Sequence, residues 1–295
     1  MSRYSYGLLV SGELGLTCLR SICQNHQISF VLTDKKSFVI ISYCTDNNIP
    51  VFAGSPRDGS AISFLNYYQV DILLSINYLF LVESDIINFP RKYAINFHGS
   101  LLPRYRGRTP HVWAIINNET ETGITAHFIS ETCDSGDIVY QEKVHIDSKM
   151  TGADLLSDFS SRYPRIVDTV IDLIESGSIE AKKQDESKAT YFGKRSPADG
   201  MINWHWQRER IYNWVRAQAK PYPGSFTYYN GKKIILHQIS FSELGFFDTD
   251  ADGLVLEGGE QPIIKTPNGA IQILLMETEI PVALEKGEIL CKISE

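Results

Sequence analysis

The chain has 295 residues, of which 43% are hydrophobic and 21% are charged, and its formal net charge is −7. This length is enough for two domains with separate cores, and the composition is typical of a water-soluble globular protein. No apolar run approaches the ~20 residues of a membrane span, and the acidic balance disfavours a general nucleic-acid-binding protein.

The cysteines and the N-terminal sequence indicate a cytoplasmic protein. Five cysteines are scattered along the chain without a C-x-x-C pair, which predicts reduced thiols rather than disulfides or a zinc site. The first ten residues lack the layout of a signal peptide. We expect no bound metal, because five histidines show no metal-ligand spacing and are predicted to be structural: His26, His111, His127, His205 and His237.

The first hundred residues alternate short apolar runs with segments that are long enough for helices. Near-continuous apolar runs are typical of strands buried on both faces of a parallel sheet. The pattern therefore predicts an open α/β domain. The expected strands are 5–10, 28–33, 49–52, 71–77 and 93–98, and the expected crossover helices are 14–25 and 36–48.

The next hundred residues continue with two strands and a long helix. Runs 123–130 and 136–146 flank a short polar turn, and we expect them to pair antiparallel at the edge of the sheet. Apolar residues recur at near-helical spacing over 152–176, which predicts a helix. A polar, irregular segment follows, and then a candidate helix at 207–219.

The last part of the chain consists of strand-like runs separated by glycine turns. Asn230-Gly231 and Asn268-Gly269 are hairpin signals. We predict an open, Rossmann-like, mostly parallel sheet with an antiparallel edge pair, followed by a small C-terminal antiparallel β-barrel-like domain. The expected boundaries are 1–180 for the first domain, 181–205 for a linker and 206–295 for the second domain.

Asn96 and His98 end the fifth expected strand. Because they are two residues apart, their side chains leave the same face of the strand, at the end where open α/β sheets bind ligands. A carboxamide can stabilise a developing oxyanion, and an imidazole can move a proton. The alternative is a pair of hydrogen-bonded polar residues without a chemical role.

The stretch "NFHGSLLPRYRGRTP" (96–110) closely resembles the N-x-H-x-S-L-L-P-x-Y-R-G signature of the 10-formyltetrahydrofolate-dependent formyltransferases. Three further segments are similar to family segments in the same order, and the resemblance extends over about 90% of the chain. These segments are "ETETGITAHFI", "YFGKRSPADGMINW" and "VRAQAKPYPGSF".

The resemblance implies which residues carry the chemistry. Asn96 and His98 would face the oxyanion that forms when an amine attacks the formyl carbon on folate N10. Asp134, in the turn "CDSGDI", would orient or polarise His98 and help to take the proton from the amine. For Asp134 the alternative is a turn carboxylate that binds backbone N–H groups. The expected co-substrate is N10-formyltetrahydrofolate.

The same resemblance implies a folate pocket. Asn77, Tyr78 and Leu79 follow the fourth strand, which in the family lines the pterin pocket largely through main-chain groups. Of the three arginines in the loop after His98, we expect Arg106 to bind folate and Arg108 to bind the acceptor substrate, because folate and nucleotide diphosphates are both anions. A solvated basic loop is the alternative for at least one of the three.

Two branches of the family have this two-domain layout, the methionyl-tRNA formyltransferases and the nucleotide-sugar N-formyltransferases. The former use a basic insertion after the second strand, whereas here Lys35 and Lys36 are the only basic residues between Thr33 and Ile49. From Met201 onward six Lys and three Arg stand against nine Glu and three Asp, a net charge of −3. A surface that binds tRNA phosphates would be basic, so a small anionic substrate is favoured.

The resemblance is closest to the formyltransferases of UDP-4-amino-4-deoxyarabinose and of dTDP-4-amino-4,6-dideoxyglucose. Lys194 and Arg195 would then bind the diphosphate, and Tyr222 would lie near the base or sugar. The alternatives are a solvated linker pair for the first two and a wedge in the P-Y-P-G turn for Tyr222.

We therefore expect a sugar N-formyltransferase for surface-polysaccharide (lipopolysaccharide O-antigen) biosynthesis, with a dTDP-sugar as its acceptor. We expect a homodimer that binds neither nucleic acid nor membrane. Formylation of methionyl-tRNA and non-catalytic binding of folate or a nucleotide are the alternatives. The three residues Asn96, His98 and Asp134 are all present, which disfavours the non-catalytic alternative.

Overall fold

Residues 3–279 and 281–290 are described by a computed structural model, and they form two compact units. The first unit comprises the chain up to Gly107 together with 122–144 and 158–192. The second unit comprises 108–121, 145–157 and the chain from Gly193 onward. The boundaries predicted from the sequence, 1–180 and 206–295 with a linker between them, stay a prediction.

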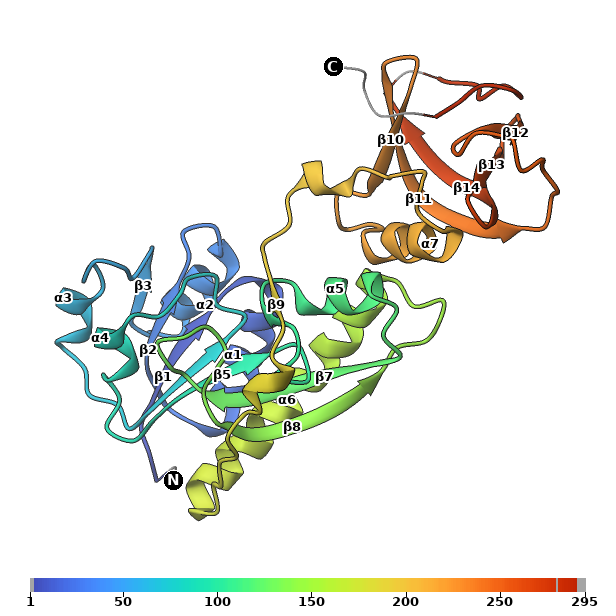
Figure 1. Ribbon diagram of the computed structural model, residues 1–295. Helices are drawn as coiled ribbons and strands as arrows, with labels where there is room; N and C mark the ends of the chain where they lie inside the picture. The colour runs from blue at the N-terminus through green and yellow to red at the C-terminus, as the bar shows by residue number, and fades with distance from the viewer. Residues whose placement is uncertain (1–2, 280, 291–295) are drawn as a thin grey trace. The chain divides into compact units, whose positions relative to one another are not determined.

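Seven strands form the sheet of the first unit: β1 (Tyr6–Val10), β2 (Ile28–Thr33), β3 (Val51–Ala53), β4 (Ile72–Ile76), β5 (Tyr93–His98), β7 (Glu121–Phe128) and β8 (Ile138–His145). Their order is β3-β2-β1-β4-β5-β7-β8 (Figure 1). The first five are parallel, and β7 runs antiparallel to β5. The predicted open, mostly parallel sheet with an antiparallel edge is confirmed.

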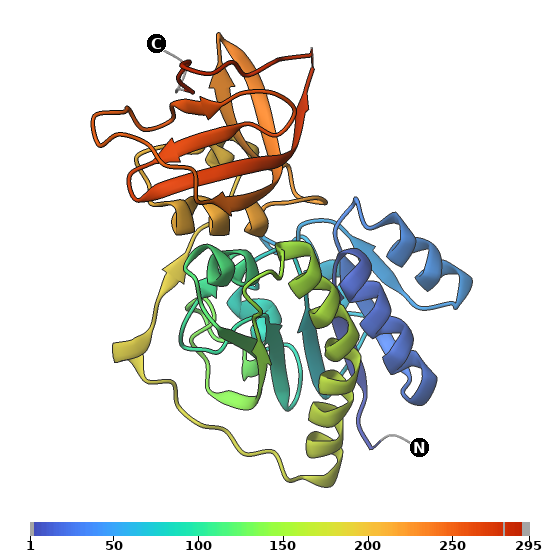
Figure 2. The same cartoon turned by 90° about the vertical axis from the view of Figure 1, so that its right-hand side faces the viewer.

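Helices cover both faces of this sheet because its central strands are apolar on both sides. On one face α1 and α6 lie side by side in front of the sheet (Figure 2), and the Tyr6 hydroxyl donates to Glu175 of α6 at 2.7 Å. On the other face α3 and α4 pack on a core that includes Leu9, Phe30 and Leu73. The helices are α1 (Gly12–Asn25), α2 (Phe38–Asp46), α3 (Ile62–Leu65), α4 (Ser84–Ile87) and α6 (Gly152–Ser176).

The second unit is built on a five-stranded antiparallel sheet in the order β10-β11-β14-β13-β12, with β10 (Ser225–Tyr229), β11 (Lys232–Ser242), β12 (Val255–Glu257), β13 (Ile263–Thr266) and β14 (Gly269–Thr278). This sheet confirms the predicted antiparallel C-terminal domain. Asn230 and Gly231 both have left-handed φ angles (49° and 74°) and form the predicted two-residue hairpin turn.

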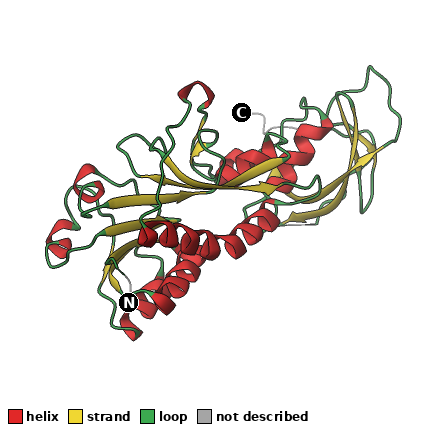
Figure 3. Cartoon of the chain, turned by 90° about the horizontal axis from the view of Figure 1, so that it is seen from below, coloured by secondary structure: helices red, strands yellow, loops and turns green. Residues whose placement is uncertain are grey.

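Two helices of the second unit pack together, α5 (Pro110–Ile116) and α7 (Arg208–Ala217), and α7 also packs on β11 and β14. Figure 3 shows the helices, strands and loops of the chain in separate colours. The Arg210 guanidinium donates to the carbonyl oxygen of Ile116 at 3.2 Å, which satisfies an acceptor at the C-terminal end of α5. The short elements β6 (Arg106–Gly107) and β9 (Tyr191–Phe192) pair in parallel within the first unit, and two 3-10 turns span Glu186–Lys188 and Pro197–Gly200.

Substitution of Gly123, in β7, can test how closely the edge of the sheet is packed. A Cβ atom at this position would overlap the carbonyl oxygen of Glu142 and the side chain of Leu101. We expect Gly123→Ala to lower the free energy of unfolding in urea by about 1–3 kcal/mol. Gly245→Ala is the matched control, because a Cβ there meets no atom within 4 Å. Equal stability of the two variants would contradict the close packing at Gly123.

Candidate active site

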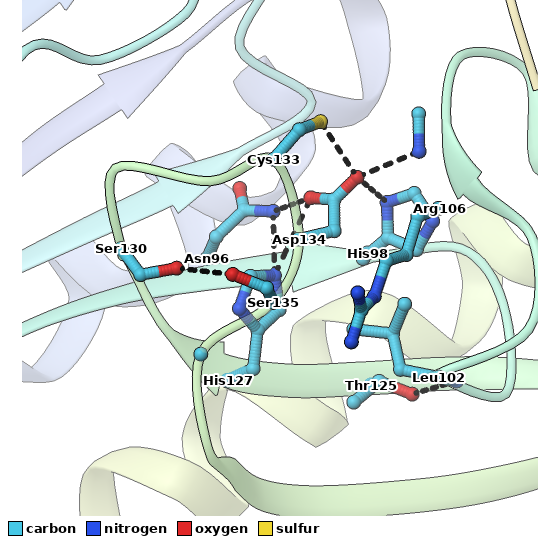
Figure 4. A network of polar contacts seen from close by, with 12 residues as sticks. Asn96, His98, Leu102, Arg106, Thr125, His127, Ser130, Cys133, Asp134 and Ser135 are labelled. Carbon is cyan, nitrogen blue, oxygen red and sulfur yellow. Dashed lines mark hydrogen bonds and ion pairs between the residues drawn. The ribbon is translucent and has the colours of Figure 1, made fainter. Parts of the chain in front are cut away.

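Asn96 and His98 lie at the carboxyl end of β5, where pairing in the sheet changes from parallel to antiparallel. β5 pairs in parallel with β4 and antiparallel with β7. In this register Asn96 is opposite His127, and His98 is opposite Thr125. Figure 4 shows Asn96 and His98 on either side of the Asp134 carboxylate. The structure thus brings the three residues predicted to be catalytic together.

The imidazole of His98 is buried and held by one strong contact. Its Nε2 atom lies 2.7 Å from the carbonyl oxygen of Tyr105. A carbonyl oxygen only accepts, so Nε2 carries a hydrogen, and in the neutral ring Nδ1 is unprotonated. Nδ1 lies 3.6 Å from Asp134 Oδ2. His98 can therefore take up a proton at Nδ1, next to a carboxylate that stabilises the resulting imidazolium.

The Asp134 carboxylate receives contacts from several chain segments. The Gly107 backbone N–H donates to Oδ2 at 2.8 Å, and the Cys133 thiol lies 3.2 Å from the same oxygen. The Asn96 carboxamide nitrogen and His127 Nε2 each lie 3.5 Å from Oδ1. Burial of the carboxyl opposes its ionisation, but the two histidines and the backbone N–H outweigh burial and hold the pKa of Asp134 well below its usual range.

Tyr105 adopts a left-handed backbone conformation, with φ of 61°. For a non-glycine residue this conformation costs about 1–2 kcal/mol. The contacts of the residue offset this cost: its ring stacks on Phe192 with centroids 4.8 Å apart, and its N–H donates to Thr190 Oγ1 at 2.8 Å. These contacts fix the carbonyl group to which His98 donates.

Arg106, which the sequence places at folate, has a fully buried side chain that is 0% exposed. Its guanidinium binds the Glu186 carboxylate through two nitrogens at 2.6 and 2.9 Å, and it donates to Gln184 Oε1 at 2.7 Å. The Gln184 amide in turn donates to the carbonyl oxygens of Asp134 and Gly136, at 2.8 and 2.7 Å. Arg106 thus supports the turn that carries Asp134. Its contact with folate stays a prediction.

The predicted pterin-pocket residues follow β4 directly. Asn77 has a left-handed φ of 54°, and its side-chain nitrogen donates to the carbonyl oxygen of Ser11 at 2.9 Å. The Tyr78 hydroxyl is buried and has no hydrogen-bond partner among the described residues, and burial raises the pKa of this hydroxyl. The Leu79 side chain is 48% exposed.

The predicted substrate-binding residues all belong to the second unit. Arg195 and Lys194 line a pocket of about 240 Å³ together with Trp113, Gly193, Asp199 and Trp214. The Arg195 guanidinium stacks on Trp113 and Trp214, at 4.9 and 4.4 Å from the ring centroids. It also donates to Gln218 Oε1 at 2.7 Å. These contacts fix its orientation at the pocket.

The other predicted substrate residues have different surroundings. Lys194 is exposed at the pocket, and Arg108 is half-buried just before α5. The Tyr222 hydroxyl lies 2.6 Å from His111 Nε2, and burial raises the pKa of Tyr222 to about 12. The roles of these residues in substrate binding stay predictions.

Sequence reasoning missed three residues at these sites. His127 was expected to be structural, whereas it contacts both Asn96 and Asp134. Gln184 lay in the expected linker, and Trp113 lay in a segment with no predicted element. The sequence could have indicated His127, because it lies in the next predicted strand, "TGITAHF". Antiparallel pairing of that strand with the one that ends in Asn96 and His98 would bring His127 close to Asn96 or His98.

Among residues 3–279 and 281–290, no group of three or more His, Cys, Asp or Glu side chains is arranged to hold a metal ion. Within the same residues, no helix has both the length and the apolar character to cross a membrane.

Two family models match the chain. The formyl transferase model matches residues 13–171, and the formyl transferase C-terminal domain model matches residues 194–288. The first match alone covers more than half of the chain. The chain belongs to the formyl transferase family and is a formyl transferase, as the N-x-H stretch predicted.

Solved structures with the same fold extend over most of the chain. The N-formyltransferase from Helicobacter canadensis, in complex with folinic acid and dTDP-3-aminofucose, is 22% identical with a TM-score of 0.72, over 92% of this chain and 99% of that one. A 4-N formyltransferase from Francisella tularensis is 21% identical with a TM-score of 0.68, over 80% and 97%. The methionyl-tRNA formyltransferase from Clostridium thermocellum is 16% identical with a TM-score of 0.59, over 81% and 93%.

The lowered pKa of Asp134 makes the stability of the fold depend on pH. The carboxyl of an unfolded chain titrates near pH 4, roughly, and the folded-state pKa lies below that value. The ionised carboxylate therefore stabilises the folded protein above about pH 4, and this contribution is lost as the pH falls further. We expect the gap in unfolding free energy between wild type and Asp134→Asn, measured in urea, to narrow below about pH 4. A gap that stays constant from neutral pH into this range would contradict the assignment.

Proposed function

We propose that the protein transfers the formyl group of N10-formyltetrahydrofolate to the amine of a nucleotide-linked amino sugar, with dTDP-4-amino-4,6-dideoxyglucose as the favoured acceptor, for surface-polysaccharide biosynthesis. The observation that carries the proposal is the convergence of three groups in a formyl transferase fold. Asn96 Nδ2 and His98 Nδ1 lie 3.5 and 3.6 Å from the two oxygens of Asp134. The proposal includes a cytoplasmic homodimer that needs no metal.

Formyl transfer needs a donor to the formyl oxygen and an acceptor for the proton that the amine loses. An Asn96 N–H can donate to that oxygen as negative charge develops on it. His98 Nδ1 can accept the proton, because its Nε2 hydrogen is held by Tyr105. The bond from the amine to the formyl carbon forms, the bond from that carbon to folate N10 breaks, and the proton held by His98 can go to N10.

The segment after β4 supports the folate part of the proposal. Leu79 and Leu81 are 48% and 51% exposed and offer an apolar edge that a flat aromatic ring can cover. The buried Tyr78 hydroxyl, unpartnered among the described residues, is available to a polar group of a ligand. The folinic acid in the Helicobacter canadensis structure agrees with a folate co-substrate.

The pocket of the second unit supports an anionic acceptor. Lys194 offers an ammonium group, and Arg195 offers a guanidinium whose orientation is set by Trp113 and Trp214. A diphosphate suits both groups, with Arg108 and Tyr222 proposed at other parts of the acceptor. The dTDP-linked amino sugar in the Helicobacter canadensis structure supports this class of substrate.

Formylation of methionyl-tRNA is the second candidate function, because the Clostridium thermocellum tRNA enzyme shares the fold. The net charge of −7 for the chain counts against this candidate. Binding of tRNA phosphates depends on clustered Lys and Arg side chains.

The three central residues can be tested individually. We expect Asn96→Ala, His98→Ala and Asp134→Ala each to lower kcat by about 100-fold or more. The first two remove groups that act on the reacting atoms, and the third removes the carboxylate that stabilises the His98 imidazolium. Asp137→Ala, in the same turn as Asp134, is the control and should keep most of the activity. Far-UV circular dichroism establishes that each variant is folded. Near wild-type turnover by any of the three would remove that residue from the mechanism.

The acceptor can be identified with a panel of amines. Wild-type protein and 10-formyltetrahydrofolate are offered dTDP- and UDP-linked 4-amino and 3-amino sugars and charged initiator tRNA, and product masses are recorded. We expect formylated nucleotide sugar, with the highest kcat/KM for the dTDP-linked 4-amino sugar. Turnover of the tRNA alone would overturn the proposed acceptor class in favour of the second candidate.

A further inference from the structure

We infer that His127 is a positioning residue for formyl transfer, which holds the Asn96 carboxamide so that one of its N–H groups is available to the formyl oxygen. The two residues are cross-strand partners in the β5–β7 pair, and Asn96 Nδ2 lies 3.2 Å from His127 Nε2. His127 is 2% exposed, so it acts from beneath Asn96 and not by contact with a substrate. This inference rests on the proposed formyl transfer.

The tautomer of His127 follows from its second contact. Its Nδ1 atom lies 2.8 Å from the carbonyl oxygen of Phe128. That oxygen can only accept, so Nδ1 carries the hydrogen, and Nε2 of the neutral ring is an acceptor. Two groups lie near this acceptor, the Asn96 carboxamide at 3.2 Å and the Asp134 carboxylate at 3.5 Å. Only the carboxamide has a hydrogen to donate, so its nitrogen end faces Nε2 and donates to it.

This contact sets the direction of the Asn96 carboxamide. If the amide were turned by 180°, its oxygen would face two acceptors, His127 Nε2 and Asp134 Oδ1. The first amide hydrogen is taken by His127. The second amide hydrogen can be donated to Asp134 Oδ1, but the distance from Asn96 Nδ2 to that oxygen is 3.5 Å, the long limit of a hydrogen bond. A formyl oxygen can therefore replace Asp134 Oδ1 as the acceptor at little cost in free energy.

If His127 only filled space in the core, its substitution would have different effects from those expected of a positioning residue. The cavity left by a smaller side chain would destabilise the fold whatever residue stands at position 96. A positioning role acts through Asn96, so the kinetic effect of His127 should disappear when Asn96 is removed. This difference can be measured with a pair of substitutions and a double-mutant cycle.

The kinetic test compares His127→Leu with His127→Gln. Leucine has no acceptor, and we expect kcat to fall by about 10- to 100-fold while KM for both substrates changes by less than about threefold. Glutamine offers a carbonyl acceptor and should restore most of kcat. Thr122→Val is the matched control, because it replaces another buried polar residue of β7 with an apolar one and should leave kcat unchanged. Equal losses for the leucine and glutamine variants would overturn the inference.

The double-mutant cycle separates positioning from packing. In the Asn96→Ala background, His127→Leu should lower kcat by less than about twofold. The same fold-loss in both backgrounds would show that His127 acts independently of Asn96, which would overturn the inference. A variant that loses folded structure by circular dichroism is replaced in the cycle by His127→Met, which keeps more of the side-chain volume.

A spectroscopic measurement tests the contact without an acceptor amine, so it does not depend on which substrate the enzyme uses. In the ¹⁵N-histidine spectrum of the wild-type protein near neutral pH, His127 should be the neutral Nδ1–H tautomer, and its Nε2 resonance should shift in Asn96→Ala. A protonated Nε2 would overturn the inference even if formyl transfer is confirmed. If no amine in the panel is formylated, the proposed function fails. The spectrum still shows whether His127 Nε2 accepts a hydrogen bond from the Asn96 carboxamide.

Discussion

The ionised carboxylate of Asp134 is the group on which the site depends. A buried carboxylate without partners would be costly, and here its donors come from β5, from the loop after β5 and from the side chain next to it in its own turn. His98, whose Nδ1 atom faces the same carboxylate at 3.6 Å, is held in turn by the carbonyl oxygen of Tyr105. The charge therefore fixes the distances between residues that are far apart in the sequence.

The sequence predicted the strands and long helices because their apolar residues follow regular periods. The bounds of β2, β5 and α6 agree with the predicted ones to the residue. Helix α5 was not predicted, since it is short and begins with Pro110 in a segment dominated by the N-x-H signature. Helices α3 and α4, of four residues each, are too short to show a helical period.

The grouping of Asn96, His98 and Asp134 was predictable from local motifs. Asn96 and His98 belong to one short stretch, and Asp134 belongs to a recognisable turn. The contacts of Arg106 were not predictable, because Gln184 and Glu186 lie about eighty positions along the chain. A basic loop residue indicates an anionic partner, but the partner found in the fold is a carboxylate of the protein itself. His127 was missed for a related reason, since its contacts depend on the register between β5 and β7.

Gln184 lies beyond the C-terminal end of α6, yet its side chain binds the turn that carries Asp134. A shortened enzyme that stops at the end of α6 would retain Asn96, His98 and Asp134 in its sequence. It would leave the buried Arg106 guanidinium without its counter-ion and two carbonyl groups without their donor. Strand β9 also pairs with β6, with Gly107 opposite Phe192. The smallest fragment able to assemble this centre must therefore reach at least Phe192, and any shortened enzyme for isolated study has to include that residue.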